Sequence, residues 1–314
     1  MKRIVCSLLV GMAMAAQPVP AIAGNSGKDP AQAIAILQLV YIESQFNKAY
    51  KAGEMAQALQ WARQCYTTAE QAHLDNGRMF CAGYVADAAE GTGDFSLSRE
   101  ARLIQKELAV RFSNDAQLWS ALNGLGTIAW RKKLYLDALT WYDQAYDLSL
   151  KWKDETGANS IRFNRANVYA DMGEKDKALG EYKACLKFAR KLKDKYDEGL
   201  DLSAIGMLLS DKGRPAEALR YHSQALDIFR GLGKKDNEAM VLLNIGVALE
   251  QLGKYEEALT YDKQALRLYQ EIGDRHGEYL ISKNIAIHLR KLGRFKEAAE
   301  YQAHADFLSR QGGY

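Results

Sequence analysis

A period of 40 residues runs through almost all of this 314-residue chain and constrains its fold more than any other feature. One column of the period holds turn residues, at Gly53, Gly93, Lys133, Gly173, Gly213, Gly253 and Gly293. Seven positions earlier lies a mostly small column: Phe46, Ala86, Gly126, Ala166, Gly206, Gly246 and Ala286. Five positions after the turn come Ala58, Ser98, Ala138, Ala178, Ala218, Ala258 and Ala298. Seven positions later still come Cys65, Gln105, Ala145, Cys185, Ala225, Ala265 and Ala305. A fixed period of this length predicts a solenoid of stacked units that share one continuous core.

Each copy of the period reads as a helical hairpin. In residues 239–278, Leu242, Ile245 and Leu249 have the spacing of one buried helix face, and Gly253 then breaks the pattern. A second apolar helix pattern follows, and the small columns mark where the paired helices approach to about 8–10 Å. We therefore predict an all-α fold, a right-handed α-solenoid superhelix of about seven helix–turn–helix units. The units lie near residues 31–78, 79–118, 119–158, 159–198, 199–238, 239–278 and 279–314.

The grid formed by Gly246, Ala258 and Ala265 resembles that of the tetratricopeptide repeat family. The 40-residue unit resembles the longer repeats of this family in kinesin light chains and spindle-orientation adaptors. Those repeats often carry a Gly-Asp such as Gly273-Asp274. The resemblance covers about residues 31–311 and implies a protein-binding superhelix with the first helix of each hairpin on the concave side. Three residues depart from the small-residue pattern: Phe46, Ser98 and Gln105.

The first 23 residues have the composition of a secretory signal peptide. Lys2 and Arg3 precede an apolar run over residues 4–16, and Ala21-Ile22-Ala23 offers an A-x-A cleavage site. A membrane anchor is the alternative, but the run is too short to cross a bilayer. We expect cleavage near Ala23, a short linker over residues 24–30, and a bacterial protein that is periplasmic or secreted.

The charge of the chain argues against nucleic acid as a partner. The formal net charge of +3 falls to +1 when Lys2 and Arg3 are removed (3 − 2), and acidic residues interleave with the basic ones throughout. Binding to a phosphate backbone requires a strong local excess of basic residues. We expect a protein or peptide partner, no membrane span in the mature chain, and scope for a homo-oligomer.

Three cysteines remain after residue 23. Cys65 and Cys185 occupy a column that is alanine in four other units, so a small, buried, unreactive thiol accounts for both. Cys81 follows Cys65 across one turn, and export would permit a disulfide between them. Paired helices meet the geometry of a disulfide only at restricted positions, so this pairing stays open.

No motif for catalysis emerges from the chain. Residues 124–129 fit G-x-G-x-x-A, but a dinucleotide site needs a strand before the motif, and the repeat already explains Gly126. The five histidines lack the spacing of a zinc site. We predict a non-enzymatic protein with no catalytic residue, metal or cofactor.

Asparagines mark the candidate binding surface. Asn164, Asn244 and Asn284 lie two residues before the small column, and Asn123 lies one place earlier in its unit. The resemblance implies that asparagines so placed contact the main chain of an extended peptide, because an amide both donates and accepts. The alternative is a ladder between helices or simple exposure to solvent. Three apolar residues of the first helices, Met207, Leu243 and Val247, favour a partly apolar ligand.

Charged and aromatic residues extend this hypothesis. Lys283 and Arg290 could attract an acidic group at the C-terminal end, and Trp130 beside Arg131 could anchor a partner. Packing is the alternative for Trp130, because four of the five tryptophans fall within one unit. The sequence thus predicts a periplasmic adaptor that binds a peptide or helix in its groove. The alternative is a structural, self-assembling envelope component that uses its convex face and edges.

Overall fold

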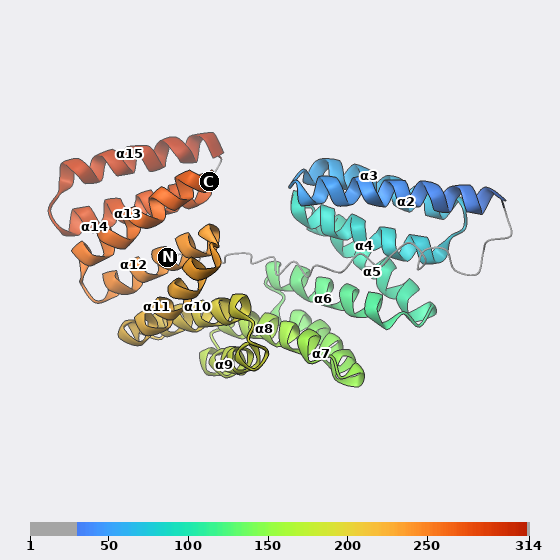
Figure 1. The fold of residues 1–314 in the computed structure, drawn as a ribbon, viewed down its shortest axis with the longest axis horizontal. Helices are drawn as coiled ribbons and strands as arrows, with labels where there is room; N and C mark the ends of the chain where they lie inside the picture. Colours follow the sequence, from blue (N-terminus) through green and yellow to red (C-terminus); the bar gives the residue numbers. More distant parts are fainter. Residues whose placement is uncertain (1–29, 313–314) are drawn as a thin grey trace. The chain divides into compact units, whose positions relative to one another are not determined.

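The computed structural model describes residues 30–312, which form fourteen helices and no strand (Figure 1). The expected signal peptide, residues 1–23, lies outside the described residues. The first helices of the seven hairpins are α2 (Pro30–Lys51), α4 (Asp75–Thr92), α6 (Asp115–Arg131), α8 (Glu155–Asp171), α10 (Lys195–Asp211), α12 (Lys235–Gln251) and α14 (Arg275–Lys291). The second helices are α3 (Met55–Gln71), α5 (Phe95–Arg111), α7 (Tyr135–Trp152), α9 (Lys175–Leu192), α11 (Pro215–Leu232), α13 (Tyr255–Ile272) and α15 (Phe295–Gly312). The prediction of an all-α fold of about seven helical hairpins is confirmed.

Every described loop between helices turns through one residue with positive φ. These residues recur every 20 positions, from Gly53 at φ 77° to Gly293 at 74°. Most are glycine, which adopts this conformation without steric cost. Lys133 does the same at φ 61°, so the one non-glycine member of the turn column keeps the geometry of the others.

The small columns are buried where two helices of a hairpin meet. Ala138, Ala178 and Ala258 are 0% exposed, and so are Ala145 and Ala265. The small column of the first helices faces a second-helix column that varies widely in size: Ala62, Arg102, Tyr142, Tyr182, His222, Asp262 and Gln302. A Cβ added at Gly126 would lie 2.5 Å from Cε1 of Tyr142. Each glycine of this column therefore makes room for the larger side chain opposite.

The departures at Phe46 and Gln105 are compensated in the same way. Phe46 faces Ala62, and both belong to one buried cluster, so the large residue has moved to the first helix and the small one to the second. Gln105 is 1% exposed and donates from Nε2 to Oε1 of Gln117 at 2.7 Å. A Cβ at Gly83 would lie 2.9 Å from that Nε2, so this glycine gives the glutamine its space. The first two repeats keep the hairpin geometry with different side chains.

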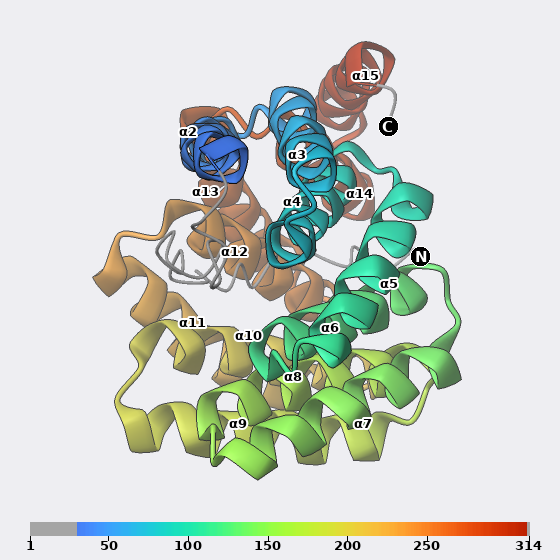
Figure 2. The same cartoon turned by 90° about the vertical axis from the view of Figure 1, so that its right-hand side faces the viewer.

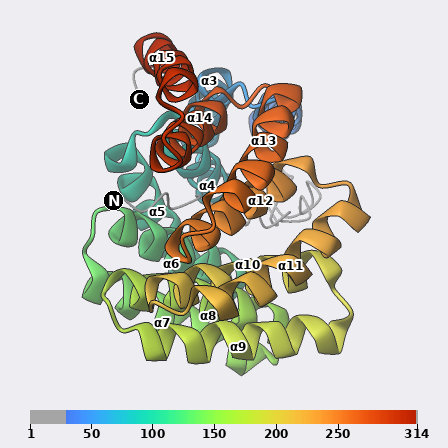
Figure 3. The same cartoon turned by 90° about the vertical axis from the view of Figure 1, so that its left-hand side faces the viewer.

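The described residues divide into two compact units, and the boundary between them falls between residues 161 and 162, within α8. Within each unit, consecutive helices pack against each other. First helices also contact the next first helix, as in α2–α4 and α4–α6 of the first unit (Figure 2) and α10–α12 and α12–α14 of the second (Figure 3). Among the described helices, neighbouring second helices do not contact each other to this extent. Within a unit the second helices are therefore more widely spaced than the first.

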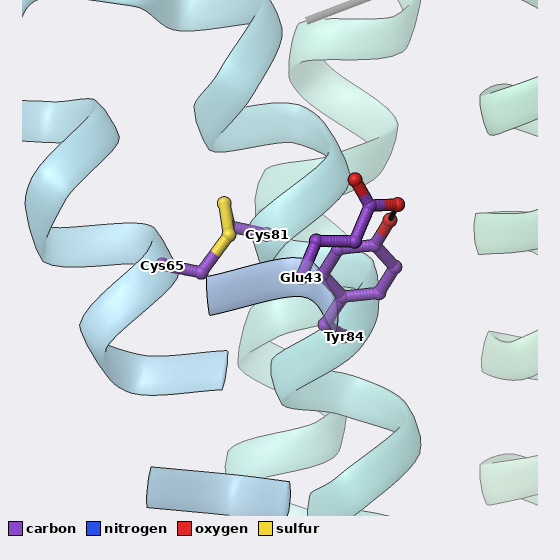
Figure 4. The surroundings of a disulfide bond; sticks show 4 residues. All are labelled: Glu43, Cys65, Cys81 and Tyr84. Atoms are coloured by element: carbon purple, nitrogen blue, oxygen red, sulfur yellow. Dashed lines mark hydrogen bonds between the residues drawn. A yellow bond between two sulfur atoms is a disulfide. The ribbon is translucent and has the colours of Figure 1, made fainter. Parts of the chain in front are cut away.

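A disulfide joins Cys65 on α3 to Cys81 on α4, with the two Cα atoms 5.5 Å apart (Figure 4). The interpretation of Cys65 as a reduced, buried thiol is therefore wrong. The separation of 16 residues places both cysteines at the contact between consecutive hairpins, where side chains are short enough to meet. Beside the disulfide, the Tyr84 hydroxyl donates to the Glu43 carboxylate and links α4 to α2 (Figure 4). Cys185 is a buried thiol outside the disulfide.

Candidate peptide-binding surface

Three predicted asparagines share one position on the first helices of the second unit. Asn164 on α8, Asn244 on α12 and Asn284 on α14 are all half-buried. Because α12 and α14 contact each other, Asn244 and Asn284 lie at the same turn of adjacent helices. We call these three residues the asparagine row. The helix between, α10, carries Ala204 at this position, so the row is interrupted there.

A row of apolar side chains lies three residues after the asparagine row. Met207 on α10, Val247 on α12 and Ile287 on α14 are half-buried, and they share the position that follows the small column. Sequence reasoning missed Ile287, although the period of 40 residues from Val247 could have found it. Leu243 is only 7% exposed and belongs to the core, so the expectation that it lines the surface is wrong.

The two predicted cations of α14 contact neighbouring side chains. Lys283 donates from Nζ to the Tyr279 hydroxyl at 3.2 Å and lies 5.0 Å from the centre of that ring. Arg290 is exposed and donates to Oε1 of Gln302 on α15 at 3.1 Å. Lys283 is adjacent in sequence to Asn284 and is half-buried like it, whereas Arg290 is directed toward the second helix of its hairpin.

The remaining predicted residues belong to the first unit, on α6. Asn123 and Trp130 are half-buried, and the Arg131 guanidinium lies 5.4 Å from the centre of the Phe95 ring on α5. Two other tryptophans have structural partners, because Trp119 donates to the Ser149 hydroxyl at 2.8 Å and Trp152 donates to Asp115 at 3.1 Å. Packing thus accounts for these two tryptophans.

A buried ionic pair lies behind the asparagine row in the last two repeats. Nδ1 of His288 on α14 lies 2.7 Å from Oδ2 of Asp262 on α13, and both side chains are fully buried. Nε2 of the same ring lies 3.5 Å from Glu250 on α12. Burial alone would lower the pKa of His288, but hydrogen bonding to Asp262 and the nearby Glu250 raise it to about 9. These residues connect three helices, and the signal in the sequence was His288, which stands in a column that holds Ile128, Val168 and Leu208 in other repeats.

The G-x-G-x-x-A sequence over residues 124–129 has a packing explanation. A Cβ at Gly124 would lie 2.3 Å from Nε of Arg102, and Gly126 makes room for Tyr142. Arg102 is buried and pairs with Asp87 and Glu90 on α4. Both glycines thus serve the contacts between helices, and the segment lies within α6 with no strand before it in the described residues.

Residues 30–312 contain neither a metal cluster nor a candidate membrane span. No group of three or more histidine, cysteine, aspartate or glutamate side chains is arranged to hold a metal there. In the same range, no helix combines the length and apolar character needed to span a bilayer.

Comparison with known proteins identifies the repeat. The profile of the tetratricopeptide repeat family matches three overlapping ranges, residues 157–231, 200–271 and 237–305. Residues 157–305 contain tetratricopeptide repeats. Curated proteins compared by sequence provide no match.

Solved structures extend the likeness to both units. BtubC from P. vanneervenii is 18% identical, with a TM-score of 0.63 over 70% of this chain and 93% of that one. Aspartyl phosphate phosphatase F from Bacillus subtilis is 12% identical, with a TM-score of 0.71 over 89% and 72%. The kinesin light chain-like repeats of P. anserina are 12% identical, with a TM-score of 0.52 over 61% and 95%. At these identities the likeness establishes the tetratricopeptide fold.

Proposed function

We propose that this protein is an exported, non-enzymatic scaffold that binds an extended segment of a partner protein along the asparagine row. The observation that carries the proposal is the placement of Asn164, Asn244 and Asn284 at one position of the first helices, each half-buried. An extended chain offers a main-chain amide about every 3.3 Å, and the side-chain amide can bond both its N–H and its C=O.

The surroundings of the row support such a ligand. Met207, Val247 and Ile287 offer apolar contacts for the side chains that alternate with the main-chain groups. Nδ2 of Asn244 is buried with no hydrogen-bond partner within the described residues, and rotation of the amide would turn this donor toward a peptide carbonyl. Lys283 adds a positive charge beside Asn284, which favours an acidic group in the bound segment. Binding of this kind is consistent with one similar solved structure, a Rap protein complexed with competence and sporulation factor.

Two observations support the proposal that the protein is exported. Residues 1–23 have the composition of a signal peptide, and the Cys65–Cys81 disulfide suits an oxidising compartment such as the periplasm. Intact-mass measurement of the exported protein tests this part. We expect Gly24 at the mature N-terminus, and a retained Met1 or a lipid adduct would contradict it.

Site-specific crosslinking tests the binding surface. A photo-crosslinking amino acid at Val247 should capture a partner in envelope extract, whereas the same group at the exposed Lys263 on α13 should not. The triple variant Asn164→Ala/Asn244→Ala/Asn284→Ala should weaken binding of that partner at least about tenfold, since each hydrogen bond contributes about 0.5–1.5 kcal/mol. Unchanged affinity in a triple variant that keeps its circular dichroism would move the interface away from the row.

A self-assembling role is the second candidate, and the end of the first unit favours it. Ile34, Leu37 and Tyr41 on α2 are 58%, 71% and 59% exposed, and their spacing places them on one side of the helix. Terminal repeats of a solenoid normally present a polar outer face. Analytical ultracentrifugation should then show a mass that rises with concentration in the wild type and stays monomeric in Leu37→Glu.

A further inference from the structure

Most repeats carry an aromatic side chain at one position of the second helix. One second-helix column holds Trp61, Ala101, Trp141, Glu181, Tyr221, Tyr261 and Tyr301. Lys106 on α5 places its Nζ 5.8 Å from the centre of the Trp141 ring on α7, so this ring reaches the preceding second helix. Tyr221 on α11 likewise lines a cleft together with Leu186 and Arg190 of α9. In these two repeats the aromatic side chain thus lies beside the preceding second helix.

Two residues of this column, Ala101 and Glu181, are not aromatic. Glu181 pairs with Arg162 at 3.1 Å and with Arg165 at 3.7 Å, both on α8. Ala101 on α5 is 5% exposed and has only a methyl group to place in the gap between α3 and α5. A cavity of about 280 Å³ lies there, partly open to solvent. We call it the Ala101 pocket.

The lining of the Ala101 pocket is apolar inside and charged at its rim. Ala82 and Val85 of α4 form the floor with Ala101, and Tyr66, Leu97 and Ile104 form the walls. Arg63, Thr67 and Glu100 also line the pocket, and all three are exposed. An apolar cavity of about 150 Å³ already accommodates benzene, so this one has room for a ring. Water inside it finds few polar partners, and its displacement by an apolar group is favourable.

We propose that the Ala101 pocket binds a tryptophan or tyrosine side chain of a partner protein. The ring takes the position at which five other repeats carry their own Trp or Tyr, between two second helices and over the first helix. Its flat faces contact Leu97 and Ile104, and the Arg63 guanidinium stacks on the exposed part of the ring. The Glu100 carboxylate accepts from the indole N–H or the phenol O–H. This site is on the second helices of the first unit and does not depend on the asparagine row.

The corresponding cleft three repeats later differs from the Ala101 pocket in the polarity of its lining. Residues 186, 217, 220, 221 and 224 are displaced by 120 positions from 66, 97, 100, 101 and 104. There Leu97 is replaced by Glu217, Ile104 by Gln224, and Ala101 by Tyr221. The later cleft keeps a cavity of about 230 Å³ beside its own ring, but charged and polar groups form most of its lining. Natural repeats of this chain thus supply substitutions that the hairpin tolerates.

Methyl NMR of the purified protein tests the proposal, with N-acetyl-tryptophanamide as the probe. We expect saturable shifts confined to the methyl groups of Ala82, Val85, Leu97, Ala101 and Ile104, with a dissociation constant in the millimolar range, as suits one ring. N-acetyl-alaninamide should cause no such shifts. Ala101→Tyr copies the fifth repeat, keeps the fold, and should raise the dissociation constant at least about tenfold.

Two further variants keep the test decisive. Leu97→Glu copies Glu217 and should also weaken binding of the probe if Ala101→Tyr fails to fold. Glu107→Trp adds a ring at an exposed position of α5, outside the pocket, and should leave binding unchanged. Absence of shifts in the wild type, or shifts retained in folded Ala101→Tyr, would overturn the proposal. Saturation by free indole but not by the amide would assign the pocket to a small molecule and equally refute docking of a partner.

Discussion

Replacing one buried carboxylic acid, Asp201, should stabilise the second unit at neutral pH. Asp201 on α10 is 3% exposed, and its Oδ2 is buried without a hydrogen-bond partner in the described residues. The column that it occupies is otherwise mostly apolar, with Ile161, Val241 and Ile281 in other repeats. Burial, and then the nearby charges of Asp197 and Asp194, raise the pKa of Asp201 to about 8. The side chain is therefore protonated in the folded protein at neutral pH.

The size of the effect follows from proton linkage. An aspartate in the unfolded chain has a pKa of about 3.9, so between that pH and about 8 the folded state binds the additional proton. Because the folded pKa is raised, the contribution of Asp201 to the free energy of unfolding is most favourable below about pH 4. It falls by about 1.4 kcal/mol per pH unit up to about pH 8. At pH 7 the accumulated loss is about 4 kcal/mol. Asp201→Val removes this loss and fills the site as the sixth repeat does.

Urea unfolding of wild type and Asp201→Val at several pH values from 4 to 8 measures the effect. We expect the free energy of unfolding of the variant to exceed that of the wild type by about 2–4 kcal/mol at pH 7, and the difference to shrink toward pH 4. Other titrating groups are common to both proteins and cancel in the difference. Val241→Asp, the reverse change one repeat later, should destabilise the protein. A difference that does not vary with pH, or a less stable variant at pH 7, would refute the reasoning.

Four other predictions concern the packing and the charges. Cys65→Ala/Cys81→Ala should lose about 3 kcal/mol of stability, because the disulfide closes a loop of 16 residues, and reduction of the wild type should reproduce the loss in urea unfolding. Ala265→Leu should cost about 1–3 kcal/mol, since Ala265 is 0% exposed at a helix contact, and unchanged stability would show that this column tolerates volume. Gly126→Ala should destabilise through its contact with Tyr142, and in thermal unfolding the loss in Gly126→Ala/Tyr142→Ala should be smaller than the sum of the two single losses. NMR titration should find His288 still protonated at pH 8, since the Asp262 contact raises its pKa to about 9. The same titration should find His222 still neutral at pH 5.5, since burial lowers its pKa to about 4. The stability that protonated His288 contributes is lost as the pH rises from 6.5 through 9.

The period of the sequence predicted the hairpins because each turn and each close helix contact restricts one position strongly. Gly53 and its equivalents adopt positive φ, and Ala258 and Ala265 are fully buried at contacts. These restrictions are local and act on one residue at a time, so they are visible in a single chain. The sequence does not decide whether Cys65 and Cys81 form a disulfide, because the bond depends on the relative placement of two side chains across a helix contact.

The candidate site was less predictable than the fold. The period placed Asn244 and Asn284 at one position, but not their exposure, and it could not distinguish the half-buried Val247 from the buried Leu243. Exposure of a first-helix residue depends on how closely the next first helix packs, which the spacing within one repeat does not determine. The identity of the partner is harder still to predict from the sequence, because the fold does not restrict the residues that would recognise it.

Departures from the repeat pattern carry the information that the pattern itself does not. At Phe46 the departure is balanced by Ala62 across the same contact, so the volume is conserved and the change is structural. At Asp262 it is balanced by His288, which pairs with the buried carboxylate. At Ala101 no neighbouring side chain takes up the volume of the missing ring, and a cavity remains. A departure that its neighbours compensate stabilises the solenoid, whereas one that they leave uncompensated is where a second molecule can supply the missing group.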